Sequence, residues 1–274
     1  MVDNMNVYNE FKKEIGLANV TNEFIELIYR TFCDEHQDLL SDNNKLKAFS
    51  EKHKINLTQL EQKSVDRIAG LYIINIHSLF SDFLTGFIKL PGAPTQRLKE
   101  KSSKEDMLSW VLKGVYPQGY DEEIECGYYI CNYYRLMRNS LIHLGKKKRS
   151  KVENNALDAA QKYFSESSYF QKYKNKLEAP HPVEELGFDD QVLFSKAAID
   201  LATRIYFEST YDLRLHLKHH KDDVYRKVAT FTDRDRIEKY LYYHFDQYYP
   251  IRDKKYHDII EDIITDFLEQ GVLA

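Results

Sequence analysis

Apolar residues recur every three or four positions along most of the chain, which is the spacing of helices with one buried face. The strongest pattern predicts a long helix over 58–90, ended by a Pro-Gly-Ala-Pro turn. Another long helix is predicted over 188–217, and shorter ones over 106–114 and 152–170. Only 10 Gly and 6 Pro interrupt the chain, so we expect an all-α protein.

The two ends of the chain have weaker patterns. Residues 6–32 predict one or two short helices, with 19–23 as the candidate break and Thr21 as the candidate N-cap. From Lys218 onward the composition shifts toward charge and tyrosine, and an amphipathic helix is predicted over 256–268. We therefore expect three parts: an N-terminal helical extension (1–57), a central helical domain (58–217) and a C-terminal helical extension (218–274).

Residues 121–151 hold the most informative pattern. A helix in this segment has one apolar face, including Tyr133, Tyr134 and Met137, which should be buried against other helices. Gly145 then follows, as is common just beyond a helix end. The opposite arc of the helix is a polar stripe formed by Asn132, Arg135, Arg138, Asn139 and His143.

Positive charge is concentrated around the end of this helix, although the chain as a whole has a net charge of −4. No acidic residue lies between Glu125 and Glu153. Such a patch is typical of a solvated turn, and it also suits the phosphate backbone of a nucleic acid. The basic residues in this window are Arg135, Arg138, Lys146, Lys147, Lys148, Arg149 and Lys151.

The segment 138–143 reads Arg-Asn-Ser-Leu-Ile-His, an Arg-Asn-x-x-x-His pattern at the end of an amphipathic helix. It resembles the motif of HEPN domains, in which an Arg and a His lie near the end of a core helix. The resemblance extends to the helical pattern over 58–217, and it implies an HEPN-like helical bundle with extra helices at both ends. It also implies a homodimer in which two motifs face one cleft, acting as a metal-independent endoribonuclease of a toxin or anti-phage defence system.

In such an enzyme the ribose 2′-hydroxyl attacks the adjacent phosphate, and no cofactor is needed. Histidine is the side chain whose unperturbed pKa lies near neutrality, so His143 is the candidate for proton transfer. Arg138 would stabilise the charge on the phosphate, and Asn139 would orient the imidazole or bind phosphate. Arg138 and His143 diverge by about 140° around a helix, so a twofold axis that pairs them between copies is expected.

Two other interpretations stay open. The motif could have arisen by chance, with Arg138 in a salt bridge and His143 capping a helix end. Alternatively, the domain is a non-catalytic HEPN-like interaction or assembly module, whose partner is an antitoxin or another defence-system subunit. In the catalytic interpretation, Arg135 and the basic run 146–151 contact the RNA substrate.

Other classes of chemistry have weaker or no signals. His216, His219 and His220 form a metal-like cluster without a second ligand pair, so we expect no metal and no cofactor. Nothing resembles a phosphate-binding glycine loop, a serine-hydrolase elbow or a dinucleotide fingerprint, which disfavours ATPases, serine hydrolases and dehydrogenases.

The expected location is the cytoplasm. The 3 cysteines have no disulfide or zinc-like pairing, which is typical of a reducing compartment. The most apolar run, 69–80, is too short to span a membrane, and the N-terminal segment has no apolar signal core.

Overall fold

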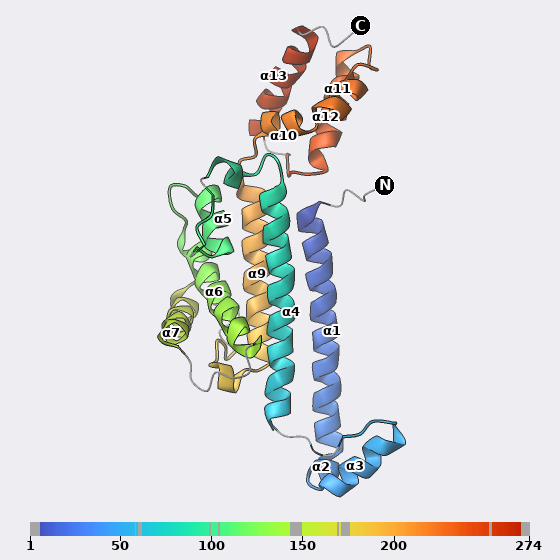
Figure 1. Cartoon of the computed structure of the whole chain (residues 1–274), viewed down its shortest axis with the longest axis vertical. Coiled ribbons are helices and arrows are strands. Elements are labelled where there is room, and N and C mark those ends of the chain that lie inside the picture. Colours follow the sequence, from blue (N-terminus) through green and yellow to red (C-terminus); the bar gives the residue numbers. More distant parts are fainter. Residues whose placement is uncertain are drawn as a thin grey trace. The chain divides into compact units, whose positions relative to one another are not determined.

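The structure, a computed structural model of the chain, describes residues 6–57, 59, 62–98, 100–103, 105–142, 150–168, 170, 176–251 and 254–269. Every regular element in these ranges is a helix, so the all-α prediction is confirmed (Figure 1). The α-helices are α1 (Val7–Glu35), α2 (Gln37–Leu40), α3 (Asn43–Lys52), α4 (Gln62–Lys89), α5 (Met107–Val115), α6 (Glu122–Ile142), α7 (Lys151–Glu166), α9 (Phe188–Glu208), α10 (Leu213–His219), α11 (Lys221–Val228), α12 (Arg234–Asp246) and α13 (Lys255–Glu269). Two short 3₁₀ helices are η1 (Pro94–Arg97) and η2 (Val183–Glu185).

α1 is one continuous helix, so the expected break over 19–23 is wrong. The Thr21 hydroxyl donates to the Leu17 carbonyl at 2.9 Å, which is a bond within the helix and not an N-cap. Ile15, Ala18 and Asn22 are all buried, so one packed face runs through the segment. Packing on that face holds the helix together where the local sequence favours a stop.

The expected single helix over 188–217 is also wrong, because the chain forms α9 and α10 with a break between them. The Tyr256 hydroxyl accepts from the Tyr211 backbone N–H and donates to the Ser209 carbonyl, each at 3.1 Å. The Asp212 carboxylate then caps the first turn of α10. These side chains satisfy backbone groups that a continuous helix would have paired within itself.

The contacts divide the chain into two compact units. Unit 1 consists of Met1–Lys12, Phe80–Asp121 and Asp200–Ala274, and unit 2 consists of Lys13–Leu79 and Glu122–Ile199. α1, α4 and α9 therefore contribute residues to both units. The three-part division expected from the sequence pattern stays a prediction.

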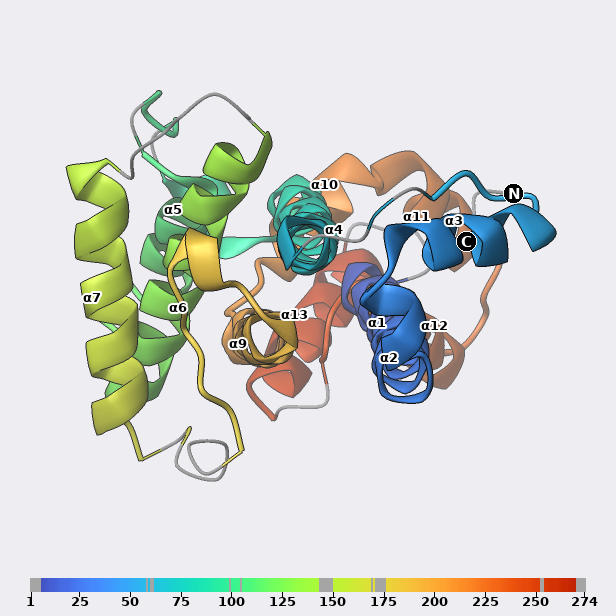
Figure 2. The ribbon, with the colours of Figure 1, turned by 90° about the horizontal axis from the view of Figure 1, so that it is seen from below.

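Unit 2 contains α2, α3, α6, α7 and parts of α1, α4 and α9 (Figure 2). α6 packs against α9 through Tyr134 and Phe194, whose stacked rings lie 4.9 Å apart. Gly70 allows α4 to approach α6 closely, because a Cβ atom there would lie 3.0 Å from the Leu141 side chain. α7 lies beside α6 in both views, so α6 is covered on several sides within this unit.

Unit 1 contains α5, α10 to α13 and the remaining parts of the long helices. Its interior is rich in aromatic side chains: the rings of Tyr211 and Tyr249 lie 4.5 Å apart, and Tyr8 stacks on Tyr206 at 5.0 Å. The high tyrosine content of the chain is therefore partly explained by a hydrogen-bonding core, in which ring faces pack and hydroxyls satisfy backbone groups.

Candidate functional site

The predicted motif lies at the end of α6, and the helix begins as its sequence suggests. Glu122, Glu123 and Glu125 occupy the first turn, where acidic side chains favour the positive end of the helix dipole. Ile130, Tyr133, Tyr134 and Met137 of the predicted apolar face are buried, whereas Tyr129, Leu136 and Leu141 are half-buried. The buried residues of α6 are Ile124, Cys126, Gly127, Ile130, Cys131, Tyr133, Tyr134 and Met137.

The described part of the polar stripe is held together by arginine–asparagine hydrogen bonds. The Arg135 guanidinium donates to Asn132 Oδ1 from Nη2 at 2.7 Å and from Nε at 3.2 Å. Arg138 Nη1 donates to Asn139 Oδ1 at 3.2 Å. The structure therefore brings Arg138 and Asn139 together, and it orients both arginines along one half-buried face.

Arg138 keeps unused hydrogen-bonding capacity. Its Nε is buried, yet it has no hydrogen-bond partner among the described residues. Among the described residues, no carboxylate forms an ion pair with the Arg138 guanidinium. The salt bridge expected for a motif that arose by chance is therefore not found among them. A buried guanidinium N–H without an acceptor is costly, which favours an anionic ligand or a further side chain at this position.

His77 of α4 belongs to the same cluster, although the sequence pattern alone did not select it. Burial, and then the positive charges of Arg138 and Arg135, lower the pKa of His77 to about 4. Its ring is therefore neutral at pH 7 and lies close enough to both guanidinium groups to feel their charge. The available signal was its position among the polar residues Asn75, Ser78 and Asp82 of the long helix predicted over 58–90.

The segment that follows α6 carries several predicted site residues: His143, Lys146, Lys147, Lys148 and Arg149 lie outside the described residues. Both ends of this segment are described. Lys151 is the exposed first residue of α7. Glu153 joins the two helices, because one carboxylate oxygen accepts from the Ser140 hydroxyl of α6 and the other from the Ser150 backbone N–H at 2.5 Å.

The histidines of the metal-like cluster are not arranged as ligands. His216 is fully buried in unit 1, with Nδ1 2.7 Å from the Tyr249 hydroxyl and Nε2 3.0 Å from Nε2 of His244. His219 is exposed. Among the described residues, no group of three or more His, Cys, Asp or Glu side chains could hold a metal ion. His216 instead belongs to a hydrogen-bonded group of rings with Tyr249 and His244.

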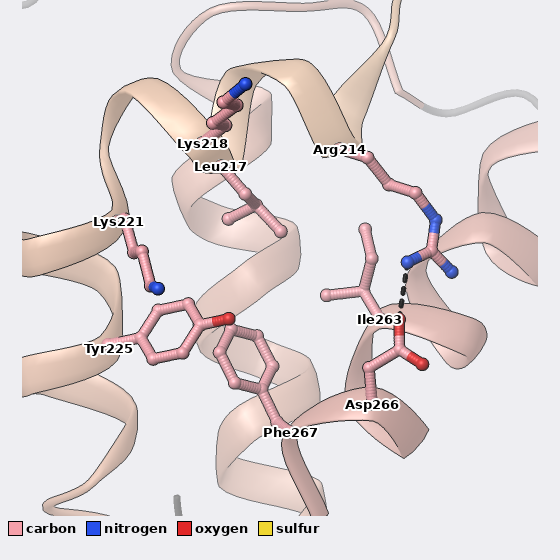
Figure 3. Close-up of a pocket in the computed structure, with 8 residues that line it drawn as sticks. All are labelled: Arg214, Leu217, Lys218, Lys221, Tyr225, Ile263, Asp266 and Phe267. Atoms are coloured by element: carbon pink, nitrogen blue, oxygen red, sulfur yellow. Dashed lines mark hydrogen bonds and ion pairs between the residues drawn. The ribbon is translucent and has the colours of Figure 1, made fainter. Parts of the chain in front are cut away.

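A separate pocket of about 240 Å³ opens in unit 1 (Figure 3). Its lining residues are Arg214, Leu217, Lys218, Lys221, Tyr225, Ile263, Asp266 and Phe267. Arg214 forms an ion pair with Asp266, so one of the three cations at the rim is already neutralised. None of the predicted site residues lines this pocket, and it gives no support to the motif.

Within the described part of the chain, one helical stretch, Arg67–Lys89, is long and apolar enough to cross a membrane. A single helix of this kind is weak support for a membrane span, because core helices of soluble proteins have the same length and composition. Ile73, Ile76 and Phe87 are fully buried within the protein, as in a core helix.

Comparison with known proteins does not assign this chain to a family. No protein-family model, no curated protein and no solved structure matches it.

Proposed function

We propose that the chain is a metal-independent endoribonuclease whose active site is built on the end of α6. The observation that carries the proposal is Arg138: its guanidinium donates to Asn139, its charge contributes to the lowered pKa of His77, and its buried Nε–H lacks an acceptor among the described residues. A phosphate oxygen is a strong acceptor for such a group, since arginine–phosphate hydrogen bonds are charge-assisted. The Arg-Asn-x-x-x-His resemblance supplies the reaction class.

The reaction uses the substrate's own nucleophile. The ribose 2′-hydroxyl oxygen attacks the adjacent phosphorus, and the bond from phosphorus to the 5′-oxygen of the next nucleotide breaks. The products are a 2′,3′-cyclic phosphate and a 5′-hydroxyl, so the proton lost by the 2′-hydroxyl is balanced by the one gained by the leaving oxygen. In the proposal, His143 transfers these protons, and Arg138 stabilises the charge on the phosphate oxygens.

The proposed active form is a homodimer. Two residues five positions apart on one helix diverge by about 140°, so Arg138 and His143 of a single copy are poorly placed to contact one phosphate. A twofold axis near the ends of two α6 helices would pair Arg138 of one copy with His143 of the other. Asn139, hydrogen-bonded to Arg138 at 3.2 Å, would then hold the guanidinium in position.

The basic residues around the site would contact the RNA backbone. Arg135 is fixed by Asn132 on the same face as Arg138, and Lys151 is exposed at the start of α7. With the run from Lys146 to Arg149 they would make RNA binding weaker as salt increases. In cells, the proposed role is that of a cytoplasmic toxin or anti-phage defence effector, restrained by an antitoxin or another subunit.

The second candidate is a non-catalytic helical assembly module. One observation favours it: α1 carries a row of large apolar side chains that are exposed, including Leu17, Val20 and Phe24. Exposed apolar rows of this size usually mark interaction surfaces. This candidate predicts oligomerisation without RNA cleavage.

A cleavage assay separates the two candidates. Purified protein is incubated with total RNA in EDTA, and the ends of the fragments are analysed. We expect 2′,3′-cyclic phosphate ends, and a loss of at least about a hundredfold in rate for both Arg138→Ala and His143→Ala.

Arg226→Ala and His53→Ala are the controls, because both replace exposed residues outside the motif. They should cleave RNA at the wild-type rate. Intact RNA with the wild-type protein at every condition would reject the enzyme, and equal cleavage by Arg138→Ala would reject the assigned site.

A further inference from the structure

α1 exposes a continuous row of large apolar side chains in unit 2. We call this row the α1 stripe. Each of its members leaves more than half of its surface exposed: Leu17 61%, Val20 63%, Phe24 61%, Leu27 62% and Ile28 51%. Single exposed apolar residues are ordinary, but five of them on neighbouring turns of one helix form a patch that a monomer rarely leaves in water.

The α1 stripe lies opposite the face that α1 already buries. At about 100° per residue, its members point roughly 180° away from Ile15, Ala18 and Asn22, which pack inside unit 2. The helix therefore has two apolar sides, and its own unit covers only one of them. A helix that is apolar on both sides is typical of a position between two packed bodies.

The spacing within the α1 stripe is that of a helix-to-helix seam. Leu17, Val20, Phe24 and Leu27 are separated by three, four and three residues, which is the repeat of positions a and d in a coiled coil. Ile28 widens the seam on one side. A row with this repeat is complementary to an identical row, since the knobs of one helix fit the holes of the other.

Charge and area favour a second copy over other occupants. No charged residue lies within the α1 stripe, and Glu26 pairs with Arg30 off to the side at 2.9 Å. A helix that binds lipid headgroups usually carries lysine and arginine along its polar face, and the sequence has no lysine or arginine between Leu17 and Ile28. At roughly 100 Å² per side chain, pairing two stripes buries about 1,000 Å², which reaches the lower limit of a specific protein interface.

We propose that the α1 stripe is a homodimerisation surface, which pairs with the α1 stripe of a second copy about a twofold axis. In unit 2, α4 and α9 lie between α1 and α6 in both views (Figures 1 and 2). Pairing through α1 therefore leaves the end of α6 free. It is an interface separate from the one that the proposed ribonuclease needs, and it does not depend on that function.

The test compares Val20→Glu/Phe24→Glu with Val152→Glu by light scattering after gel filtration, over micromolar concentrations. Val152 is the matched control, because it is 62% exposed on α7 against 63% for Val20. We expect the wild type and the control to associate, and the double variant to associate at least about a hundredfold more weakly. Circular dichroism checks that all variants fold.

Mixing two oppositely charged variants tests whether the partner of the α1 stripe is a second copy of the chain. A second double variant, Val20→Lys/Phe24→Lys, is also expected to have a lower mass than the wild type when alone, and mixing it with the glutamate variant should restore the wild-type mass. A wild type that stays monomeric, a double variant with wild-type mass, or a mixture that keeps the lower mass of the separate variants would each overturn the proposal. RNA cleavage by the same samples reports separately on α6, so failure of the interface and failure of the ribonuclease are distinguishable.

Discussion

At the scale of single residues, Asp190 in unit 2 accepts hydrogen bonds from three other residues. It is fully buried, and its carboxylate accepts from the Tyr134 hydroxyl, the His181 backbone N–H and the His181 ring, each at 2.8 Å. The Gly187 backbone N–H adds a fourth bond at 2.9 Å. One side chain thereby fixes the start of α9, the preceding loop and the middle of α6.

Replacing this carboxylate should be costly. Asp190→Ala leaves several buried donors without an acceptor, so we expect the free energy of unfolding to fall by about 3 kcal/mol or more. Urea denaturation followed by circular dichroism measures the change. Asp189→Ala is the control, because Asp189 accepts one bond from the Glu178 backbone N–H and should lose less than about 1 kcal/mol. Equal losses for the two variants would contradict this account of Asp190.

At the scale of elements, Glu153 links the end of α6 to the start of α7. Ser150 caps α7 by accepting from the Glu153 backbone N–H at 3.2 Å, and the Glu153 carboxylate accepts from the Ser150 N–H in return. This capping box was not predicted from the sequence, although Ser150 and Glu153 have the required spacing. The additional bond from Ser140 ties the cap to α6.

Glu153 therefore caps α7 and links it to Ser140 in the motif at the end of α6. We expect Glu153→Ala to lower the free energy of unfolding by about 1 to 3 kcal/mol. If the chain is the proposed ribonuclease, the Glu153→Ala variant should cleave RNA more slowly than the Asp158→Ala variant. Asp158 is an exposed acidic residue on the same helix. Thermal unfolding and the RNA assay measure the two effects. A Glu153→Ala protein with wild-type stability would show that the bond to Ser140 contributes little.

At the scale of the whole molecule, histidines with lowered pKa values make stability depend on pH. Burial is the main cause that lowers the pKa of His77 to about 4, of His216 to about 3 and of His244 to about 4. Between pH 6.5 and about 4, the unfolded chain binds protons at these sites and the folded chain does not. The free energy of unfolding must therefore fall as the pH falls through this range. His181 acts in the opposite direction, because its hydrogen bond to Asp190 raises its pKa.

The contribution of His77 can be isolated by substitution. We expect the wild-type protein to lose stability between pH 7.5 and pH 5.5, and His77→Gln to lose about 1 kcal/mol less over the same interval. Urea titrations at the two pH values give the difference. NMR titration of the His77 ring gives its pKa directly, and a value near 6.5 would contradict the burial of this side chain beside Arg138.

Helical periodicity was sufficient to predict the all-α class and most helices, because α4, α6 and α7 each have one buried apolar face with regular spacing. The same periodicity failed where distant groups decide the backbone. The end of α9 depends on the Tyr256 hydroxyl, and the continuity of α1 depends on packing in unit 2. Neither contact can be recognised from the amino-acid sequence around the end of α9 or within α1.

The candidate site divides in the same way. The polar stripe of α6 with Arg138 and Asn139 on it follows from the amino-acid sequence, since helix geometry alone places residues on a face. In contrast, the packing of the helices brings His77 within the electrostatic influence of Arg138 and Arg135 and leaves the α1 stripe exposed. Both depend on which helix packs against which, and a periodic pattern states that a face is apolar without stating what covers it.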